Sequence, residues 1–124
     1  MEIQAIHHAQ LPFAAVDKAA IRAFYNGLLG LLERTHPESS TLRFETGLQR
    51  LDLVPNSSGA VLPEPAHLAF EVRDLPTLRQ RLLDAGYALD ESRALPGHHR
   101  FYVHDPAGNP LEFLEPHESA DHTP

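Results

Sequence analysis

Short runs of alternating apolar and polar residues, separated by two helical stretches, organise this chain. In the run HHAQLPF, Leu11 and Phe13 would share one face of an extended strand, while His8 and Gln10 would share the other. A helix is predicted over residues 18–28, where apolar side chains recur at helical spacing. A strand that carries polar side chains on one face and a helix with one apolar stripe together predict a sheet covered by helices on one side.

The same order of elements occurs twice. The second copy opens on the strand candidate AHLAFEV and continues with a helix that Asp74 would cap. Three short strand candidates follow each helix: LLERTH, TLRFE and QRLDLV in the first copy, and YALDESR, HRFYVHD and NPLEFLE in the second. We therefore expect an α+β fold made of two βαβββ modules. They would occupy about residues 1–56 and 66–116 of a single domain over 1–116, and 117–124 would be a polar tail.

A histidine near the start of each module and a carboxylate near its end recur at almost the same spacing. His8 precedes Asp52 by 44 residues, and His67 precedes Glu112 by 45. Two copies of one unit, paired about an approximate twofold axis, could bring the four side chains together. Imidazole and carboxylate groups are ligands that a divalent metal ion of intermediate softness accepts. The repeat therefore predicts a metal site built by duplication.

The alternation along the last strands supports this hypothesis. In PLEFLEP, Leu111 and Phe113 would face the helix, which leaves Glu112 on the opposite face. By the same reasoning, Arg100 and Tyr102 would lie on that opposite face. A sheet that curls around this face would form a cup lined by the candidate ligands.

Composition narrows the classes of function. The chain has 124 residues and no cysteine, which excludes disulfides and thiolate chemistry and fits a cytoplasmic protein. Seventeen acidic residues against ten basic ones give a net charge of −7, which argues against nucleic acid as a partner. No apolar stretch is long enough to span a membrane. A small molecule is the remaining kind of partner.

The segments HHAQLPF, AFYNGLLGL, AHLAFEV and RFYVHDPAGNPLEFLEP resemble the vicinal oxygen chelate superfamily. This superfamily includes glyoxalase I, extradiol dioxygenases, and fosfomycin- and bleomycin-resistance proteins. The resemblance extends from Ile3 to about Pro116. It implies that the two modules form an open, eight-stranded, barrel-like sheet with the helices outside, commonly across the interface of a homodimer.

The resemblance also implies a set of metal ligands. In metal-dependent members the ligands come from the first and last strands of each module, which correspond here to His8, His67, Glu112 and Asp52. The glyoxalase pattern has a glutamate or glutamine at the position of Asp52, whose side chain is one methylene shorter. We therefore expect three ligands, His8, His67 and Glu112, for a Zn, Ni, Mn or Fe(II) ion, with Asp52 as a base or as a group that orients metal-bound water.

The leading functional hypothesis is a metal-dependent, glyoxalase-like enzyme that acts on a small molecule by chelation of two adjacent oxygens, with lyase or isomerase chemistry. Tyr102 would assist catalysis by donating a hydrogen bond to an oxyanion, and Gln10, Arg43 and Arg100 would contact the substrate. Two alternatives stay open at this point. One is an extradiol-type Fe(II) dioxygenase that uses the same ligands, and the other is a metal-free binding or resistance protein.

Overall fold

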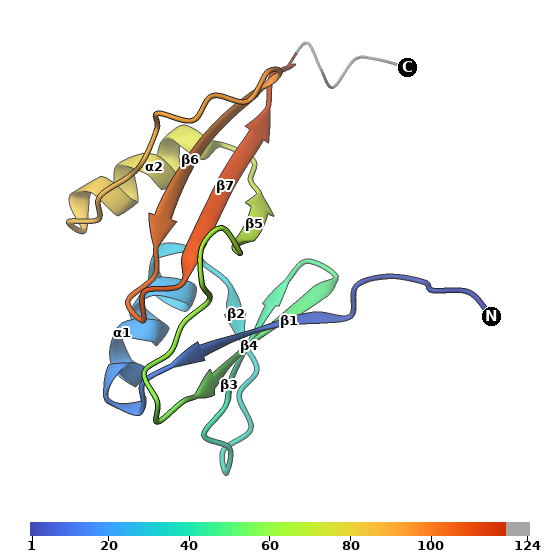
Figure 1. The fold of residues 1–124 in the computed structure, drawn as a ribbon, viewed down its shortest axis with the longest axis vertical. Helices are drawn as coiled ribbons and strands as arrows, with labels where there is room; N and C mark the ends of the chain where they lie inside the picture. Colours follow the sequence, from blue (N-terminus) through green and yellow to red (C-terminus); the bar gives the residue numbers. More distant parts are fainter. Residues whose placement is uncertain (119–124) are drawn as a thin grey trace. The chain divides into compact units, whose positions relative to one another are not determined.

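The computed structural model describes residues 1–118, and these residues divide into two compact units. Unit 1 comprises Met1–Leu62 and Pro106–Asn109. Unit 2 comprises Pro63–Asp105 and the segment that begins at Pro110. Each unit has its own open sheet and its own helix, so each is described by itself (Figure 1).

The sheet of unit 1 has four strands in the order β1-β4-β3-β2. The strands are β1 (His8–Phe13), β2 (Leu32–Glu33), β3 (Leu42–Thr46) and β4 (Gln49–Pro55). β1 runs parallel to β4, whereas β3 is antiparallel to both β4 and β2. The predicted strand LLERTH is thus reduced to two residues.

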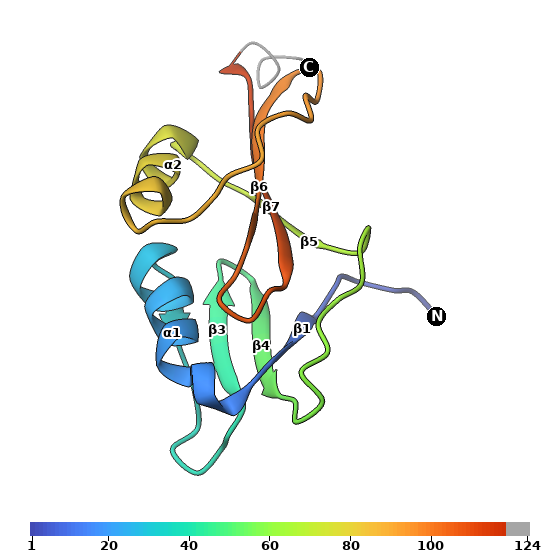
Figure 2. The ribbon, with the colours of Figure 1, turned by 60° about the vertical axis from the view of Figure 1, so that its left-hand side comes forward.

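One face of this sheet packs on the helical segment of unit 1 and carries its apolar core (Figure 2). The fully or almost fully buried strand residues are Leu11, Phe13, Leu42, Phe44, Leu51 and Leu53. They alternate with polar residues, as the sequence pattern predicts, because successive side chains of a strand point to opposite faces. Burial of these side chains stabilises the unit by the removal of apolar surface from water.

The predicted helix over 18–28 is confirmed as a helical segment, but it is not a regular α-helix. A 3₁₀ turn (Ala15–Asp17) leads into α1 (Lys18–Arg22), which continues as a π-helical turn (Ala23–Leu28). Ile21, Phe24 and Tyr25 are all fully buried, because residues at i, i+3 and i+4 lie on one face of a helix.

The sheet of unit 2 has three strands in the order β5-β7-β6. The strands are β5 (Leu68–Glu71), β6 (His98–His104) and β7 (Pro110–Pro116). β5 is parallel to β7, and β6 is antiparallel to it. α2 (Leu75–Asp84) buries a stripe of Leu75, Leu78 and Leu82.

The two helix starts differ in their caps. Asp74 caps α2, because its Oδ1 accepts from the backbone N–H of Thr77 at 3.4 Å. The carboxylate of Glu115 on β7 also accepts from the backbone N–H groups of Asp74 and Leu75, at 2.7 and 3.0 Å. Asp17, which stands at the equivalent position before α1, makes no such bond with its side chain.

The predicted strand YALDESR is wrong as an extended strand. Only Asp90 pairs with β6, in an isolated bridge to Tyr102. The Asp90 side chain then accepts from the backbone N–H of Ser92 at 2.9 Å, which turns the chain away from the sheet. The α+β class is confirmed, with open sheets of four and three strands among residues 1–118, whereas an eight-stranded barrel-like sheet stays a prediction.

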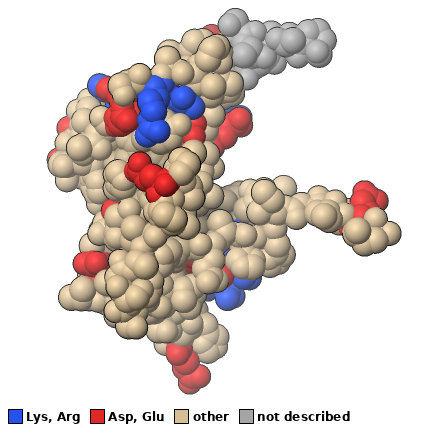
Figure 3. Space-filling view, in the orientation of Figure 1, with Lys and Arg blue, Asp and Glu red and all other residues tan. Residues whose placement is uncertain are grey.

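Two further expectations concern the ends of the chain and its surface. Most of the predicted polar tail, residues 119–124, lies outside the described residues. No helix within residues 1–118 is long and apolar enough to cross a membrane. On the face drawn in Figure 3, acidic and basic side chains are interspersed, and the described part of that face carries no extended basic surface.

Candidate functional site

The polar face of the unit 2 sheet brings together the predicted ligands His67 and Glu112. His67 immediately precedes β5, and Glu112 lies on the neighbouring strand β7. His67 Nε2 is 2.8 Å from Glu112 Oε1. The Glu112 residue is only 6% exposed, so its carboxylate is held in a largely dry setting.

The second ring nitrogen of His67 is fixed by the backbone. Its Nδ1 lies 2.8 Å from the carbonyl oxygen of Pro65, which can only accept, so Nδ1 carries a proton and donates it. The bond to Pro65 is the largest effect on the pKa of His67 and raises it above its ordinary value. Burial lowers this pKa, and the bond to Glu112 raises it again. Because Nδ1 is bonded to the Pro65 carbonyl, Nε2 is the nitrogen that faces the carboxylate of Glu112.

Two other predicted residues surround this pair. The ring of Tyr102 meets the ring of His67 edge-on, with 5.5 Å between their centroids. Arg100 Nη1 lies 3.4 Å from Glu112 Oε2, and its Nε donates to the carbonyl oxygen of Arg93 at 2.6 Å. Arg100 is thus tied mainly to the loop before β6, and its contact with Glu112 is long.

A cleft of about 320 Å³ opens in unit 2 beside this cluster. Tyr102 forms part of its wall, and the guanidinium carbon of Arg93 stacks over the Tyr102 ring at 3.7 Å from the centroid. Leu89, Val103 and Leu111 contribute apolar surface. The cleft therefore combines an apolar wall with a cation stacked on an aromatic ring.

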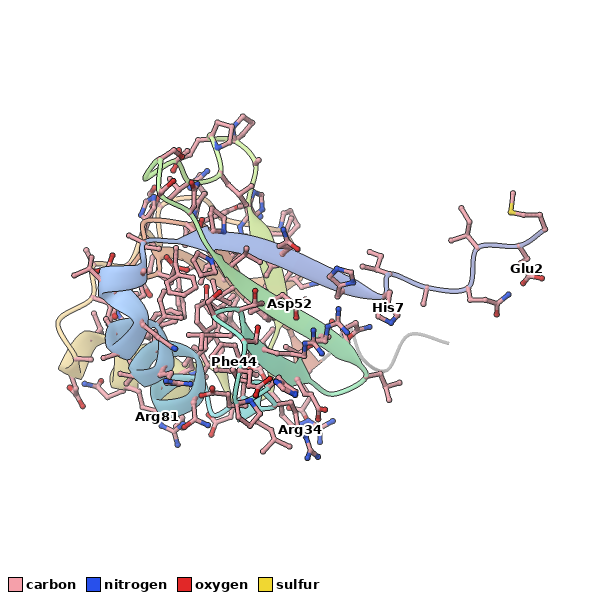
Figure 4. All side chains as sticks on the ribbon, turned by 90° about the horizontal axis from the view of Figure 1, so that it is seen from below. Glu2, His7, Arg34, Phe44, Asp52 and Arg81 are labelled. Carbon is pink, nitrogen blue, oxygen red and sulfur yellow. The ribbon has the colours of Figure 1, made fainter. Side chains whose placement is uncertain are left out.

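Unit 1 places the equivalent carboxylate in a different setting. Asp52 on β4 is 5% exposed, and both of its oxygens accept from one guanidinium: Arg50 Nε at 3.0 Å and Arg50 Nη2 at 3.1 Å. Arg43 on β3 approaches the same carboxylate, with Nε 3.5 Å from Oδ1. Figure 4 labels Asp52 within this unit. A carboxylate with two arginine partners is an ion-pair centre.

The remaining predicted residues of unit 1 are exposed. His8 lies at the start of β1, where its Nδ1 is 3.0 Å from Nδ1 of the neighbouring His7. His7, which we expect to pack toward the helix, is also exposed. Gln10 is directly opposite Asp52 in the register of β1 and β4. His8 makes no contact with Asp52 in this unit.

The pair in unit 2 fits a divalent metal ion by its chemistry and spacing. A nitrogen and an oxygen ligand, each about 2.0–2.2 Å from one ion, lie about 2.8–3.1 Å apart when their bonds meet at a right angle and about 3.3–3.6 Å apart at the tetrahedral angle. The His67–Glu112 separation of 2.8 Å, which is a direct hydrogen bond, agrees with the right-angled arrangement, and the two groups would have to move apart to hold an ion tetrahedrally. A histidine whose other nitrogen donates to a backbone carbonyl is also the usual form of a metal ligand. Among residues 1–118, however, no group of three or more potential ligands is assembled.

Two residues of these clusters were missed by sequence reasoning. Arg50 shares the polar face with Asp52 because the two are separated by one residue on a strand, so alternation could have identified it. Arg93 lies in an irregular loop, and no periodicity indicates that it stacks on Tyr102.

Comparison with known proteins gives a consistent result. The model of the family described as glyoxalase-like domain matches residues 10–114. A protein from Bacillus anthracis assigned to the glyoxalase family has a similar structure, with 31% identity, a TM-score of 0.82, and coverage of 94% of this chain and 98% of that one. Among curated proteins no sequence matches significantly.

Two more distant structures share the fold. A lactoylglutathione lyase from Agrobacterium tumefaciens has 24% identity and a TM-score of 0.74, covering 93% of this chain and 96% of that one. An antibiotic-binding protein from a Streptomyces species has 19% identity and a TM-score of 0.71, covering 94% and 99%. One fold thus carries both an enzyme and a binding protein.

Proposed function

Because the chain belongs to the glyoxalase-like domain family, as its resemblance to the vicinal oxygen chelate superfamily predicted, we propose that it is a metal-dependent enzyme acting on a small molecule. Two adjacent oxygens of the substrate would bind the metal ion, and the reaction would be of the lyase or isomerase type. We further propose a cytoplasmic homodimer in which the two βαβββ modules contribute to an open, eight-stranded, barrel-like sheet.

The observation that carries this proposal is the approach of His67 to Glu112. His67 precedes Glu112 by 45 residues in the chain, yet His67 Nε2 and Glu112 Oε1 are 2.8 Å apart, with the Glu112 side chain 8% exposed and that of His67 32% exposed. The Pro65 carbonyl holds the imidazole with Nε2 toward the carboxylate. We propose that His8 is the third ligand, on the evidence of its equivalent position in the repeat.

A metal ion bound by these groups would supply Lewis-acid stabilisation of negative charge on the substrate oxygens. The protein's own residues would orient the substrate around it. Tyr102 lies beside His67, so its phenol is a candidate hydrogen-bond donor to a substrate oxyanion. Arg100 would contribute positive charge near Glu112, since its Nη1 already lies 3.4 Å from that carboxylate.

The cleft that Tyr102 shares with Arg93 would receive the part of the substrate that does not bind the metal. Its apolar wall favours a short hydrocarbon or ring portion, because burying apolar surface is favourable. The role of Asp52 as a base stays a prediction. Any proton would have to be accepted by an oxygen that already accepts from Arg50.

A metal-free binding protein is the second candidate. Without a metal, a protonated His67 donates to both Pro65 and Glu112, so the pair is already satisfied as an ion pair. The antibiotic-binding protein from Streptomyces supports this alternative at the level of the fold. In that case the cleft beside Tyr102 would bind a ligand without turnover.

Metal binding separates these two candidates. The protein would be stripped of metal with a chelator and titrated with Zn, Ni, Mn and, without oxygen, Fe(II) in a calorimeter. We expect one of these ions to bind tightly. His67→Ala should weaken that binding by at least about 100-fold, because loss of a ligand lowers metal affinity more than loss of a residue that only hydrogen-bonds to a ligand.

The chain offers a matched control in His104. It also faces a glutamate, with Nε2 3.2 Å from Glu64 Oε1, but both side chains are more than 60% exposed. His104→Ala should leave the affinity unchanged. An affinity that is equal in wild type and His67→Ala would contradict the metal proposal and favour the binding protein. Oxygen uptake with catechols by the Fe(II)-loaded protein would favour the dioxygenase alternative.

A further inference from the structure

The polar face of unit 1 carries a cluster of charge that the proposed metal site does not use. We define the arginine site as Arg43, Arg50 and Asp52. From this cluster we propose that unit 1 binds the carboxylate group of a small molecule. The proposal extends the proposed function, because it names a chemical group of the ligand, but it stands on contacts within unit 1 alone.

The register of the strands places the site in a defined row. Gln10, Asp52 and Arg43 lie directly opposite one another across β1, β4 and β3. In the next row, Arg50 lies between His8 and Glu45. All of these positions have the parity of the polar face, because the alternate residues of the same strands are buried in the core.

Asp52 uses only part of the hydrogen-bonding capacity of its two partners. It binds the edge of Arg50 formed by Nε and Nη2, at 3.0 and 3.1 Å. A guanidinium has five N–H donors, so three of them, on Nη1 and Nη2, are not needed for this pair. Among the described residues Arg43 contacts Asp52 through Nε alone, at 3.5 Å.

These spare donors are accessible as well as ordered. The side chain of Arg50 is 29% exposed and that of Arg43 is 45% exposed, whereas that of Asp52 is only 7% exposed. The buried carboxylate therefore acts as a positioning group that holds the Arg50 fork, and the donors of both arginines remain open to solvent. An ordered guanidinium loses less entropy when it binds an anion than a freely moving one does.

Charge favours a monoanion. The arginine site has two guanidinium groups and one carboxylate, and the neighbouring Glu45 has its own partner in Arg34 at 3.3 Å. The cluster thus keeps one positive charge in a chain whose net charge is −7. A carboxylate would neutralise that charge and match the planar fork of Arg50, and the exposed amide of Gln10 would offer a further donor.

The test uses the metal-free protein, so that its outcome is independent of the metal proposal. Acetate would be titrated at constant ionic strength, with the side-chain Nε–H signals of the arginines followed by NMR. We expect saturable shifts at Arg50 and Arg43, and at least a fivefold weaker affinity in Arg50→Gln and in Arg43→Gln. Arg34→Gln, which removes the same charge from an exposed neighbour, should bind acetate within twofold of wild type.

Two further arms separate recognition of a carboxylate from attraction by charge. Arg50→Lys keeps the charge but loses the fork, so it should bind acetate about as weakly as Arg50→Gln. Inorganic phosphate should bind less tightly than acetate. Absence of saturable shifts in wild type, an unchanged affinity in Arg50→Lys, or tighter binding of phosphate would each overturn the assignment of a carboxylate site.

Discussion

Asp52 and Glu112 occupy equivalent positions in the two units but have different partners. Each lies on the polar face of a strand that is parallel to the first strand of its unit and antiparallel to the strand that precedes it in the chain. Asp52 is held by Arg50 and Arg43, whereas Glu112 is held by His67 at 2.8 Å and more loosely by Arg100 at 3.4 Å.

The register explains why the two units differ. The residue directly opposite the carboxylate is Arg43 in unit 1 and Tyr102 in unit 2. The residue two positions before the carboxylate is Arg50 in unit 1 and Pro110 in unit 2. Unit 2 therefore has no arginine at either position, and its carboxylate can accept from an imidazole. The residues around the carboxylate thus give it arginine partners in unit 1 and a histidine partner in unit 2.

The largest effect that this comparison predicts is on metal binding. Glu112→Ala removes a carboxylate ligand and should lower the affinity for a divalent ion by at least about 100-fold, or about 2.7 kcal/mol. Asp52→Ala should change that affinity by less than threefold. Calorimetric titration of both variants checks the contrast, and equal losses in the two variants would show that the carboxylates act alike.

The next effect is on stability. Asp52→Ala leaves two guanidinium groups without their shared partner and should lower the free energy of unfolding by about 2 kcal/mol. This figure is below the range for a fully buried pair because both arginines can still reach water. Urea denaturation measures the change. A loss below about 0.5 kcal/mol would mean that the ion pairs of unit 1 do not hold its sheet together.

A substitution that copies unit 1 into unit 2 sharpens the comparison further. Tyr102→Arg would place a guanidinium opposite Glu112, as Arg43 stands opposite Asp52. It should lower the affinity for a divalent ion about tenfold, or by about 1.4 kcal/mol, because the new cation competes for the carboxylate. Tyr102→Phe keeps the ring against His67 and should leave the affinity unchanged, so an equal loss in both variants would point to the phenol instead.

Sequence reasoning succeeded where one face of an element is buried. Alternation correctly placed Glu112 on the face opposite to Leu111 and Phe113, and His67 lies within hydrogen-bond distance of Glu112 although it precedes it by 45 residues. The repeat supplied the fold class for the same reason. These features depend on a period of two, which the pleat of a strand imposes on the sequence.

Sequence reasoning failed where contacts are not periodic. The segment YALDESR alternates like a strand, yet the Asp90 side chain diverts it after one bridge. The π turn over Ala23–Leu28 was also not predicted, because the apolar pattern there is that of an ordinary amphipathic helix. The sequence could not show which of the nearby arginines binds Asp52, because that depends on the distances between their side chains.

The smallest predicted effect concerns the exposed ion pair between the helical segment and β2 of unit 1. Arg22 donates to Glu33 from Nε and Nη2, at 2.9–3.1 Å, and this hydrogen bonding is the main reason that the pKa of Glu33 is lowered. Because the folded-state pKa is depressed, the contribution is present above the unfolded-state pKa of about 4.5 and is lost as pH falls through the folded-state pKa.

Glu33→Gln should therefore lower the free energy of unfolding by about 0.5 kcal/mol at pH 7, a value typical of a solvent-screened pair. The difference from wild type should shrink as the pH falls below the unfolded-state pKa of about 4.5 and through the lower folded-state pKa. Urea denaturation at a series of pH values checks this. A difference that is constant down to pH 2 would mean that Glu33 stabilises the unit by packing and not by its charge.

The most direct test of the central claim, that unit 2 binds a metal ion through His67 and Glu112, is the ¹⁵N NMR spectrum of the histidine rings during titration with Zn²⁺. We expect Nε2 of His67 to take the chemical shift of a metal-bound nitrogen while Nδ1 keeps the proton that it donates to Pro65. Rings such as that of His104 should be unaffected. A His67 spectrum that stays unchanged at saturating Zn²⁺ would contradict the account.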